Sequence, residues 1–200
     1  MVAEVNDLKR LLLTLPMVLM AATLTDGESG TAAEELEGSK KRLLAATAGL
    51  TPEQWTYRSG EGRWTIAEVV EHLSVTEGAI PMLLEKQLMA TAVSEKDLSG
   101  KDKSIRPLLV NRTNKVQTME MLKPTGRFAD GAAALRAFSG MRDKMIAYAK
   151  TTPDALRQHA MPHPALGELD GYQWILFVAG HTDRHTEQIL EVKAAAGWPK

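Results

Sequence analysis

The sequence of 200 residues contains no cysteine, and this absence removes several chemistries at once. A chain without thiols forms no disulfides, uses no thiolate nucleophile and cannot bind zinc through sulfur. Aromatic residues make up only 5% of the chain, whereas methionine and alanine are plentiful, which favours helix packing over sheet. The net charge of -1 gives no electrostatic reason to expect a nucleic acid as partner. The candidate nitrogen ligands are His72, His159, His163, His181 and His185.

A long hydrophobic run is also missing. The main apolar block, residues 11–24, is too short for a stable membrane span but has the length of a signal-peptide core. We therefore predict that residues 1–26 are an export signal and that the protein is periplasmic or extracytoplasmic. The alternatives are an extra N-terminal helix and a cytoplasmic location. Residues 26–30 are expected to form a flexible polar break before a single domain over residues 31–200.

Hydrophobic periodicity predicts an all-α protein with no credible strand pair. Apolar stripes at helical spacing indicate helices over residues 31–50, 64–88, 131–150 and 172–196. Capping residues support three of the starts: Thr65 with Glu68, Asp130, and Asp170 with Gln173. The simplest architecture is a four-helix bundle with long interhelical connections.

The connections carry the weaker expectations. Residues 92–126 are polar and charged, so we expect a lid or a substrate-facing loop there, with a helix over 108–121 as the alternative. Pro81 interrupts the second helix and predicts a kink near Gly78. Residues 159–164 contain two prolines and are expected to be an extended connection.

The last predicted helix carries polar residues on its buried face. Its stripe runs through Trp174 and Val178 and continues through His181, His185 and Gln188. Imidazoles four residues apart on a helix project side by side, close enough to bind one metal ion. Two core histidines satisfied by neighbouring hydrogen bonds are the alternative interpretation.

Three segments together resemble the DinB-like superfamily, which includes the YfiT-like metal-dependent hydrolases. They are residues 63–73 (RWTIAEVVEHL), residues 181–189 (HTDRHTEQI), and residues 163–167 (HPALG) followed by 172–175 (YQWI). The resemblance covers roughly residues 31–196. It implies a bacterial four-helix bundle in which one histidine of the second helix and two of the fourth bind a divalent metal ion.

Position by position, the resemblance implies His72, His181 and His185 as ligands of one divalent ion. Zinc or nickel is expected first, and manganese or iron are the alternatives. Three neutral imidazoles leave a coordination position open for water or substrate, as in catalytic rather than structural sites. The open position predicts an enzyme that acts on a small molecule.

Four more residues are candidates around that site. Glu68 could act as general base, although its alternative role is the capping carboxylate for the helix start. Gln188 could orient a ligand imidazole or contact substrate. Arg184 could bind an anionic substrate, with a surface salt bridge as the alternative. His163 could approach the metal as a further ligand, with a plain surface position as the alternative.

The predicted function is a metal-dependent hydrolase. A thiol-dependent S-transferase would use the same ligands, and the resemblance includes members that use bacillithiol or mycothiol as donor. A non-enzymatic metal-binding or stress-response module would have its fourth position blocked by a residue such as His163. A bundle whose histidines only pack is the remaining alternative. A homodimer through exposed helix faces is also expected.

Overall fold

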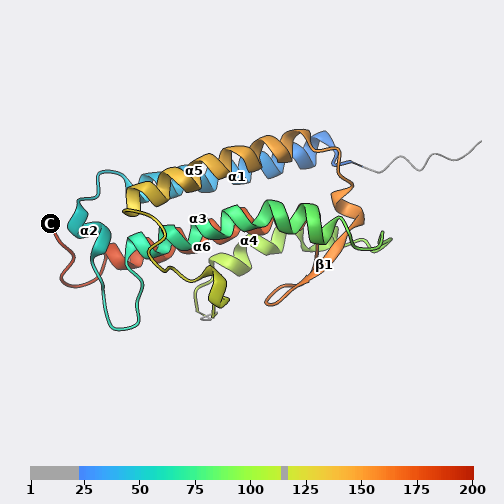
Figure 1. Cartoon of the computed structure of the whole chain (residues 1–200). Coiled ribbons are helices and arrows are strands. Elements are labelled where there is room, and N and C mark those ends of the chain that lie inside the picture. The colour runs from blue at the N-terminus through green and yellow to red at the C-terminus, as the bar shows by residue number, and fades with distance from the viewer. Residues whose placement is uncertain (1–22, 114–116) are drawn as a thin grey trace, which may run out of the picture.

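The structure, a computed structural model, describes residues 23–113 and 117–200. Residues 1–22 of the predicted export signal lie outside the described part. Four long helices form the body of the molecule: α1 (Asp26–Thr47), α3 (Ile66–Leu83), α5 (Gly131–Thr151) and α6 (Gly171–Lys193). Figure 1 shows α1 and α5 side by side above α3 and α6. Helix α1 packs on α5 and α6, and α3 packs on the same two helices, so the four close into a bundle.

Shorter elements connect the long helices. They are α2 (Pro52–Thr56), the π-helical turn η1 (Leu84–Leu88), the 3₁₀ turn η2 (Ser99–Lys101), α4 (Asp102–Val110), and the 3₁₀ turns η3 (Glu120–Leu122) and η4 (Leu156–Gln158). Helix α4 lies beneath α6 in Figure 1 and packs along it. Among the described residues, no helix is both long enough and apolar enough to cross a membrane.

The predicted helix starts are confirmed by their caps. The Thr65 hydroxyl accepts the Glu68 N–H while the Glu68 carboxylate accepts the Thr65 N–H, and Asp170 and Gln173 form the same reciprocal pair. Asp130 accepts the N–H of Ala133 at the start of α5. Each pair spans only three residues, so the local sequence suffices to form it.

The predicted polar break at residues 26–30 is wrong, because α1 already begins at Asp26. Thr25 and Glu28 form a capping box there that satisfies N–H groups at the helix start. Ala32, Ala33 and Leu36 on the first turns are buried against the rest of the core. This cap and apolar face outweigh the helix-weakening effect of the glycines in the segment.

The expected loop over residues 92–126 contains α4, which lies earlier than the alternative helix over 108–121. Ile105 and Leu109, four residues apart, are its buried positions and face α6. At Gly180 of α6, an added Cβ would lie 2.8 Å from Leu109 Cδ1 and 3.3 Å from Arg106 Cα. The absence of a side chain at Gly180 therefore lets α4 approach α6 closely.

The expected absence of a strand pair is also wrong. Strands β1 (Ala160–His163) and β2 (Gly167–Asp170) pair antiparallel, with Ala160 opposite Asp170 and His163 opposite Gly167. The extended conformation at residues 159–164 was expected from the prolines. Gly167 has φ +72°, a conformation that favours glycine and lets the chain turn back. Helix α3, for its part, runs through Gly78 and Pro81 to Leu83 before its geometry changes in η1.

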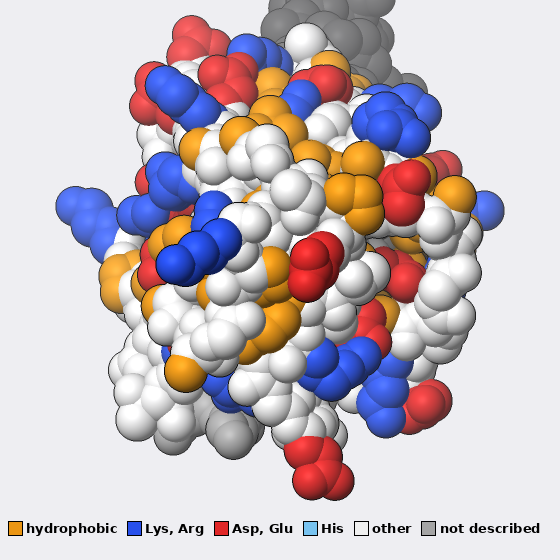
Figure 2. Space-filling view, turned by 90° about the vertical axis from the view of Figure 1, so that its left-hand side faces the viewer, with side chains coloured by type: hydrophobic (Ala, Val, Ile, Leu, Met, Phe, Trp, Pro, Cys, Tyr) orange, Lys and Arg blue, Asp and Glu red, His pale blue; other side chains and the backbone are white. Residues whose placement is uncertain are grey.

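The core consists of two apolar clusters separated by a polar layer. One cluster contains Leu36, Ile80, Met145 and Val178, and the other contains Leu43, Leu73, Phe138 and Ile189. Between them along the four long helices lie Ser39, Glu77, Arg142 and Thr182, all buried. Figure 2 views the end of the bundle near α2, where basic and acidic side chains are interspersed around small hydrophobic areas.

Candidate metal centre

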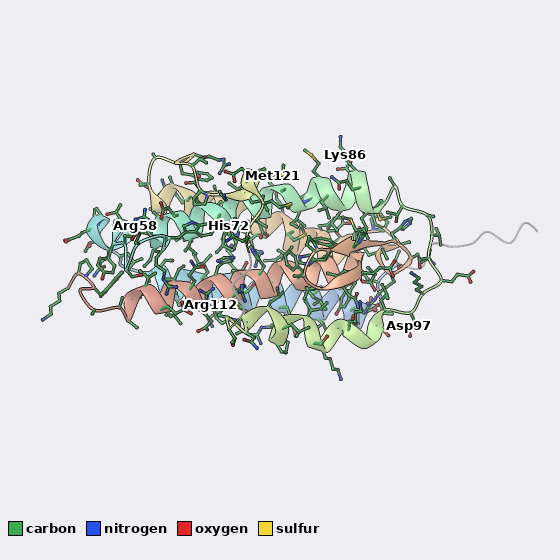
Figure 3. The ribbon with its side chains drawn as sticks, turned by 90° about the horizontal axis from the view of Figure 1, so that it is seen from below. Arg58, His72, Lys86, Asp97, Arg112 and Met121 are labelled. Atoms are coloured by element: carbon green, nitrogen blue, oxygen red, sulfur yellow. The ribbon has the colours of Figure 1, made fainter. Side chains whose placement is uncertain are left out.

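The structure brings together three of the five histidines. His72 lies on α3, and His181 and His185 lie one turn apart on α6. One ring nitrogen of each lies within 4.8 Å of the other two. His72 Nε2 is 3.3 Å from His181 Nε2, and the ring centroids are 4.6 to 5.1 Å apart. Figure 3 shows His72 between α3 and α6. The three histidines implied by the family resemblance therefore form one cluster.

Hydrogen bonds on the outer side of two rings fix how they face the cluster. His72 Nδ1 lies 2.8 Å from the carbonyl oxygen of Leu122. Because a carbonyl only accepts, His72 carries its proton on Nδ1 and directs the Nε2 lone pair toward the other histidines. His185 Nδ1 lies 2.8 Å from Gln188 Oε1, which has the same effect. Metal-binding histidines are commonly oriented in this way.

The surroundings keep the imidazoles neutral. Burial lowers the pKa of His185 to about 3, and the nearby His72 acts in the same direction. Burial, followed by the neighbouring His185 and His72, holds the pKa of His181 well below its usual value. Burial also lowers the pKa of His72, against the opposing effect of the Leu122 carbonyl. Neutral imidazole is the form that binds metal, so no histidine of the cluster has to lose a proton before a metal ion binds at neutral pH.

The donor set fits a divalent cation. Zinc bound tetrahedrally at 2.0–2.1 Å requires ligand nitrogens about 3.3–3.4 Å apart, close to the 3.3 Å between His72 Nε2 and His181 Nε2. Two of the three nitrogens are oriented as acceptors by their outer hydrogen bonds, so a cation suits the space between them. His72 and His185 are buried, whereas His181 is partly exposed. Among the three ligand candidates, His181 is thus the one with some residual exposure.

Aromatic rings surround the cluster. Trp64 stacks on His185 with centroids 6.3 Å apart and also contacts His72, and Phe177 stacks on His181 at 5.3 Å. On the side of the β1–β2 hairpin, the ring of Phe177 also contacts His163 and Trp174. These rings restrict the freedom of the imidazoles and exclude water from much of the site.

His163 lies outside the histidine cluster. Its Nδ1 accepts the backbone N–H groups of Ala165 and Leu166, so this histidine stabilises the hairpin turn. Its ring packs on Trp174, whose Nε1 is the one buried side-chain nitrogen or oxygen among the described residues without a hydrogen-bond partner. His163 therefore contacts the aromatic rings of Trp174 and Phe177 rather than the other imidazoles.

Glu68 has the capping role that was its alternative interpretation. Its carboxylate accepts the Thr65 N–H at 2.7 Å and an Arg58 N–H at 2.8 Å. Burial opposes ionisation, but the hydrogen bonds from Arg58 and Thr65 outweigh it and lower the pKa of Glu68. A carboxylate with both oxygens engaged and a lowered pKa is a weak candidate for a general base.

Arg184 holds the segment that follows α4. Its Nη1 donates to the carbonyl oxygens of Leu109 at 2.8 Å and Asn111 at 2.7 Å. Burial and the nearby Arg112 lower the pKa of Arg184. Through these two carbonyls, Arg184 joins the C-terminal end of α4 to α6.

Asp183, which lies between His181 and His185 on α6, is buried rather than exposed to solvent. It is 4% exposed and forms a bidentate pair with Arg42 at 2.7 and 2.8 Å and an ion pair with Arg106 at 2.6 Å. These arginines come from α1 and α4, which cover α6 on the sides away from the histidines. The apolar run from Tyr172 to Gly180 was the available signal, since a helix that is apolar all round is buried on all sides.

A four-helix bundle that brings one histidine of α3 together with two of α6 defines a class of proteins with a metal-type site between facing helices. The family model of the DinB superfamily matches residues 35–189, and the chain belongs to this superfamily. The family and the all-α bundle predicted from the sequence are thereby confirmed.

Two proteins from Bacillus subtilis are similar to this chain, one in sequence and one in fold. The protein YuaE, which is uncharacterized, is 28% identical over 147 residues, covering 72% of this chain and 86% of YuaE. The solved structure of YfiT superimposes with a TM-score of 0.55 and 16% identity, covering 88% of this chain and 92% of YfiT. YfiT is described as a probable metal-dependent hydrolase with an unusual four-helix bundle topology. At this identity the likeness shows a shared fold.

Proposed function

We propose that the chain is a metal-dependent hydrolase that binds one divalent ion, zinc or nickel before manganese or iron, through His72, His181 and His185. The observation that carries this proposal is the convergence of three ring nitrogens within 4.8 Å, with the outer nitrogens of two rings held by hydrogen bonds. A bound ion of this kind supplies Lewis-acid chemistry and makes hydroxide available at neutral pH. The description of YfiT agrees with the same reaction class.

The chain's own groups would prepare the site in three ways. The Leu122 carbonyl and the Gln188 side chain orient His72 and His185, so Gln188 acts on the ligand and has no need to touch substrate. Burial keeps the imidazoles neutral. We expect a small-molecule substrate to approach from the side of His181, the one partly exposed histidine of the three.

The test begins with metal content. Full-length protein and a His181→Ala/His185→Ala variant are incubated with Zn²⁺ or Ni²⁺, desalted and analysed for metal, with circular dichroism as the control for folding. We expect about one equivalent per chain in the parent and none in the folded variant. Absence of metal in the parent, or equal metal in both proteins, would overturn the proposal.

A second step separates hydrolysis from thiol transfer. The metal-loaded protein is screened against ester, amide and phosphoester substrates, with and without added low-molecular-weight thiols. Turnover in water alone that is lost in the double-histidine variant supports hydrolysis. Turnover that requires the thiol identifies an S-transferase on the same ligands. Metal binding without turnover in either condition would reject the hydrolase and support a non-enzymatic metal-binding module.

A further inference from the structure

The carbonyl that orients His72 belongs to a loop, and that loop is fastened to α3 by one carboxylate. Glu71 is 6% exposed and directly precedes His72 on α3. Its Oε1 accepts the backbone N–H of Thr125 at 2.8 Å and of Arg127 at 3.1 Å, and its Oε2 accepts that of Gly126 at 3.0 Å. Three consecutive N–H groups on one carboxylate hold this part of the loop in a single conformation.

Arg127 fastens the other part of the same loop. Its Nη1 donates to the Lys123 carbonyl at 2.7 Å and to Glu71 at 3.2 Å, and its Nη2 donates to the Met121 carbonyl at 3.1 Å. The carbonyls on both sides of Leu122 are therefore held by one guanidinium. The Leu122 carbonyl itself remains directed at His72 Nδ1. Figure 3 shows Met121 of this loop near His72.

Neighbouring residues on a helix project about 100° apart, so Glu71 and His72 face different sides of α3. One short piece of helix thus carries both the carboxylate that fixes the loop and the imidazole that the loop orients. A shift of the loop would move the Leu122 carbonyl away from Nδ1. The His72 proton could then move to Nε2, where it would occupy the lone pair that faces His181.

We infer that Glu71 and Arg127 are positioning residues of the metal centre. They hold residues 121–127 so that the Leu122 carbonyl keeps the proton of His72 on Nδ1 and its Nε2 free toward the cluster. The effect on metal affinity rests on the proposed function, whereas the effect on the His72 tautomer applies to the metal-free protein as well. Loss of such outer contacts typically weakens metal affinity by roughly 10- to 100-fold.

The test compares Glu71→Gln with Glu68→Gln. Both substitutions remove a carboxylate charge from α3. Glu68 differs from Glu71 in its partners, because it accepts hydrogen bonds from Arg58 and Thr65, whereas Glu71 accepts them from the loop. Zn²⁺ affinity is measured by competition with a chromophoric chelator. The tautomer of His72 in the metal-free proteins is measured by ¹⁵N NMR of the imidazole nitrogens.

We expect Glu71→Gln to weaken Zn²⁺ binding by roughly 10- to 100-fold and to populate the Nε2–H form of His72, while Glu68→Gln changes neither. Arg127→Gln, which leaves the buried carboxylate in place, should shift both readouts in the same direction and guards against a misfolded Glu71 variant. An unchanged tautomer and affinity in both loop variants would overturn the inference. If the parent protein binds no Zn²⁺, the proposed function fails, and the tautomer measurement still decides the positioning role.

Discussion

The bundle contains two buried polar clusters, and they differ in how their hydrogen bonds are completed. In the first, Arg142 is fully buried and donates to both oxygens of Glu77 at 2.7 and 2.8 Å. Its remaining N–H groups reach the Ser39 and Thr182 hydroxyls, both at 2.7 Å, and the Leu36 carbonyl at 3.1 Å. All four long helices contribute to this cluster, and its charges and donors are matched within the protein.

In the second cluster, ring nitrogens of His72, His181 and His185 face one another. His72 and His185 donate hydrogen bonds from their Nδ1 atoms to outer partners, so their inner lone pairs face one another and the ring of His181. A cation between the three rings would bind these inward-facing lone pairs, whereas the Arg142 cluster already contains its own cation. This difference separates a structural polar cluster from a candidate binding site, although both are buried in the same core.

The largest effect is expected from breaking the Arg142 cluster. Arg142→Met leaves the Glu77 carboxylate buried without its partner, and removal of one member of a buried ion pair costs about 3–5 kcal/mol of unfolding free energy. Chemical denaturation with and without Zn²⁺ measures this loss, which should not depend on the metal. The Arg142→Met/Glu77→Leu double variant is the control and should recover much of the loss. A loss below about 1 kcal/mol would show that water compensates the charge.

The next effect concerns the histidine cluster and depends on metal. A ligand that binds only the folded state at 100 times its dissociation constant adds about 2.7 kcal/mol to the unfolding free energy. Zn²⁺ should therefore stabilise the parent protein against denaturant by this order, and a chelator should reverse the gain. The His181→Ala/His185→Ala variant should show no gain, while the Arg142→Met variant should keep it. Equal stabilisation of parent and double-histidine variant would place zinc elsewhere.

Acidification should distinguish the two clusters in the metal-free protein. In the folded state, mainly through burial, the pKa of His185 lies at about 3, below the ordinary histidine value of 6.5. The unfolded chain then binds more protons, so stability is present above about pH 6.5 and is lost as the pH falls. From pH 7 to pH 5 this amounts to about 2 kcal/mol for His185. Urea denaturation at both pH values measures it, and His185→Leu should reduce the difference; a pH-independent stability would contradict the prediction.

Local interactions were the part of the fold that the sequence could predict. The Thr65–Glu68 and Asp170–Gln173 caps need only residues three apart, and the spacing of His181 and His185 needs only the helix period. The prediction of a polar break at residues 26–30 failed, because the glycines in this segment suggested an end to regular structure. The cap at Thr25 and the burial of the following turns decided otherwise.

For the site, the sequence predicted the histidine side chains but not the backbone groups that orient them. His72 was assigned through the family resemblance, because no spacing rule relates α3 to α6. The Leu122 carbonyl lies 50 residues away from His72 and has no side-chain identity from which it could be found. The burial of Asp183 depends on α1 and α4, and for the segment that forms α4 the sequence predicted a loop or a later helix over residues 108–121. Sequence patterns alone do not predict contacts in which a backbone atom of one segment binds a residue of a distant segment.

The smallest effects provide the finest comparison, because one acceptor is removed from each cluster. Gln188→Leu removes the partner of His185 Nδ1 and should weaken Zn²⁺ binding about tenfold, or about 1.4 kcal/mol, with little change in metal-free stability. Ser39→Ala removes one acceptor of Arg142 and should cost about 1 kcal/mol of stability, with zinc affinity unchanged. Chelator competition and denaturation of both variants measure the two quantities. If Gln188→Leu lowered stability and left zinc affinity intact, the histidine cluster would be a second structural cluster like that of Arg142.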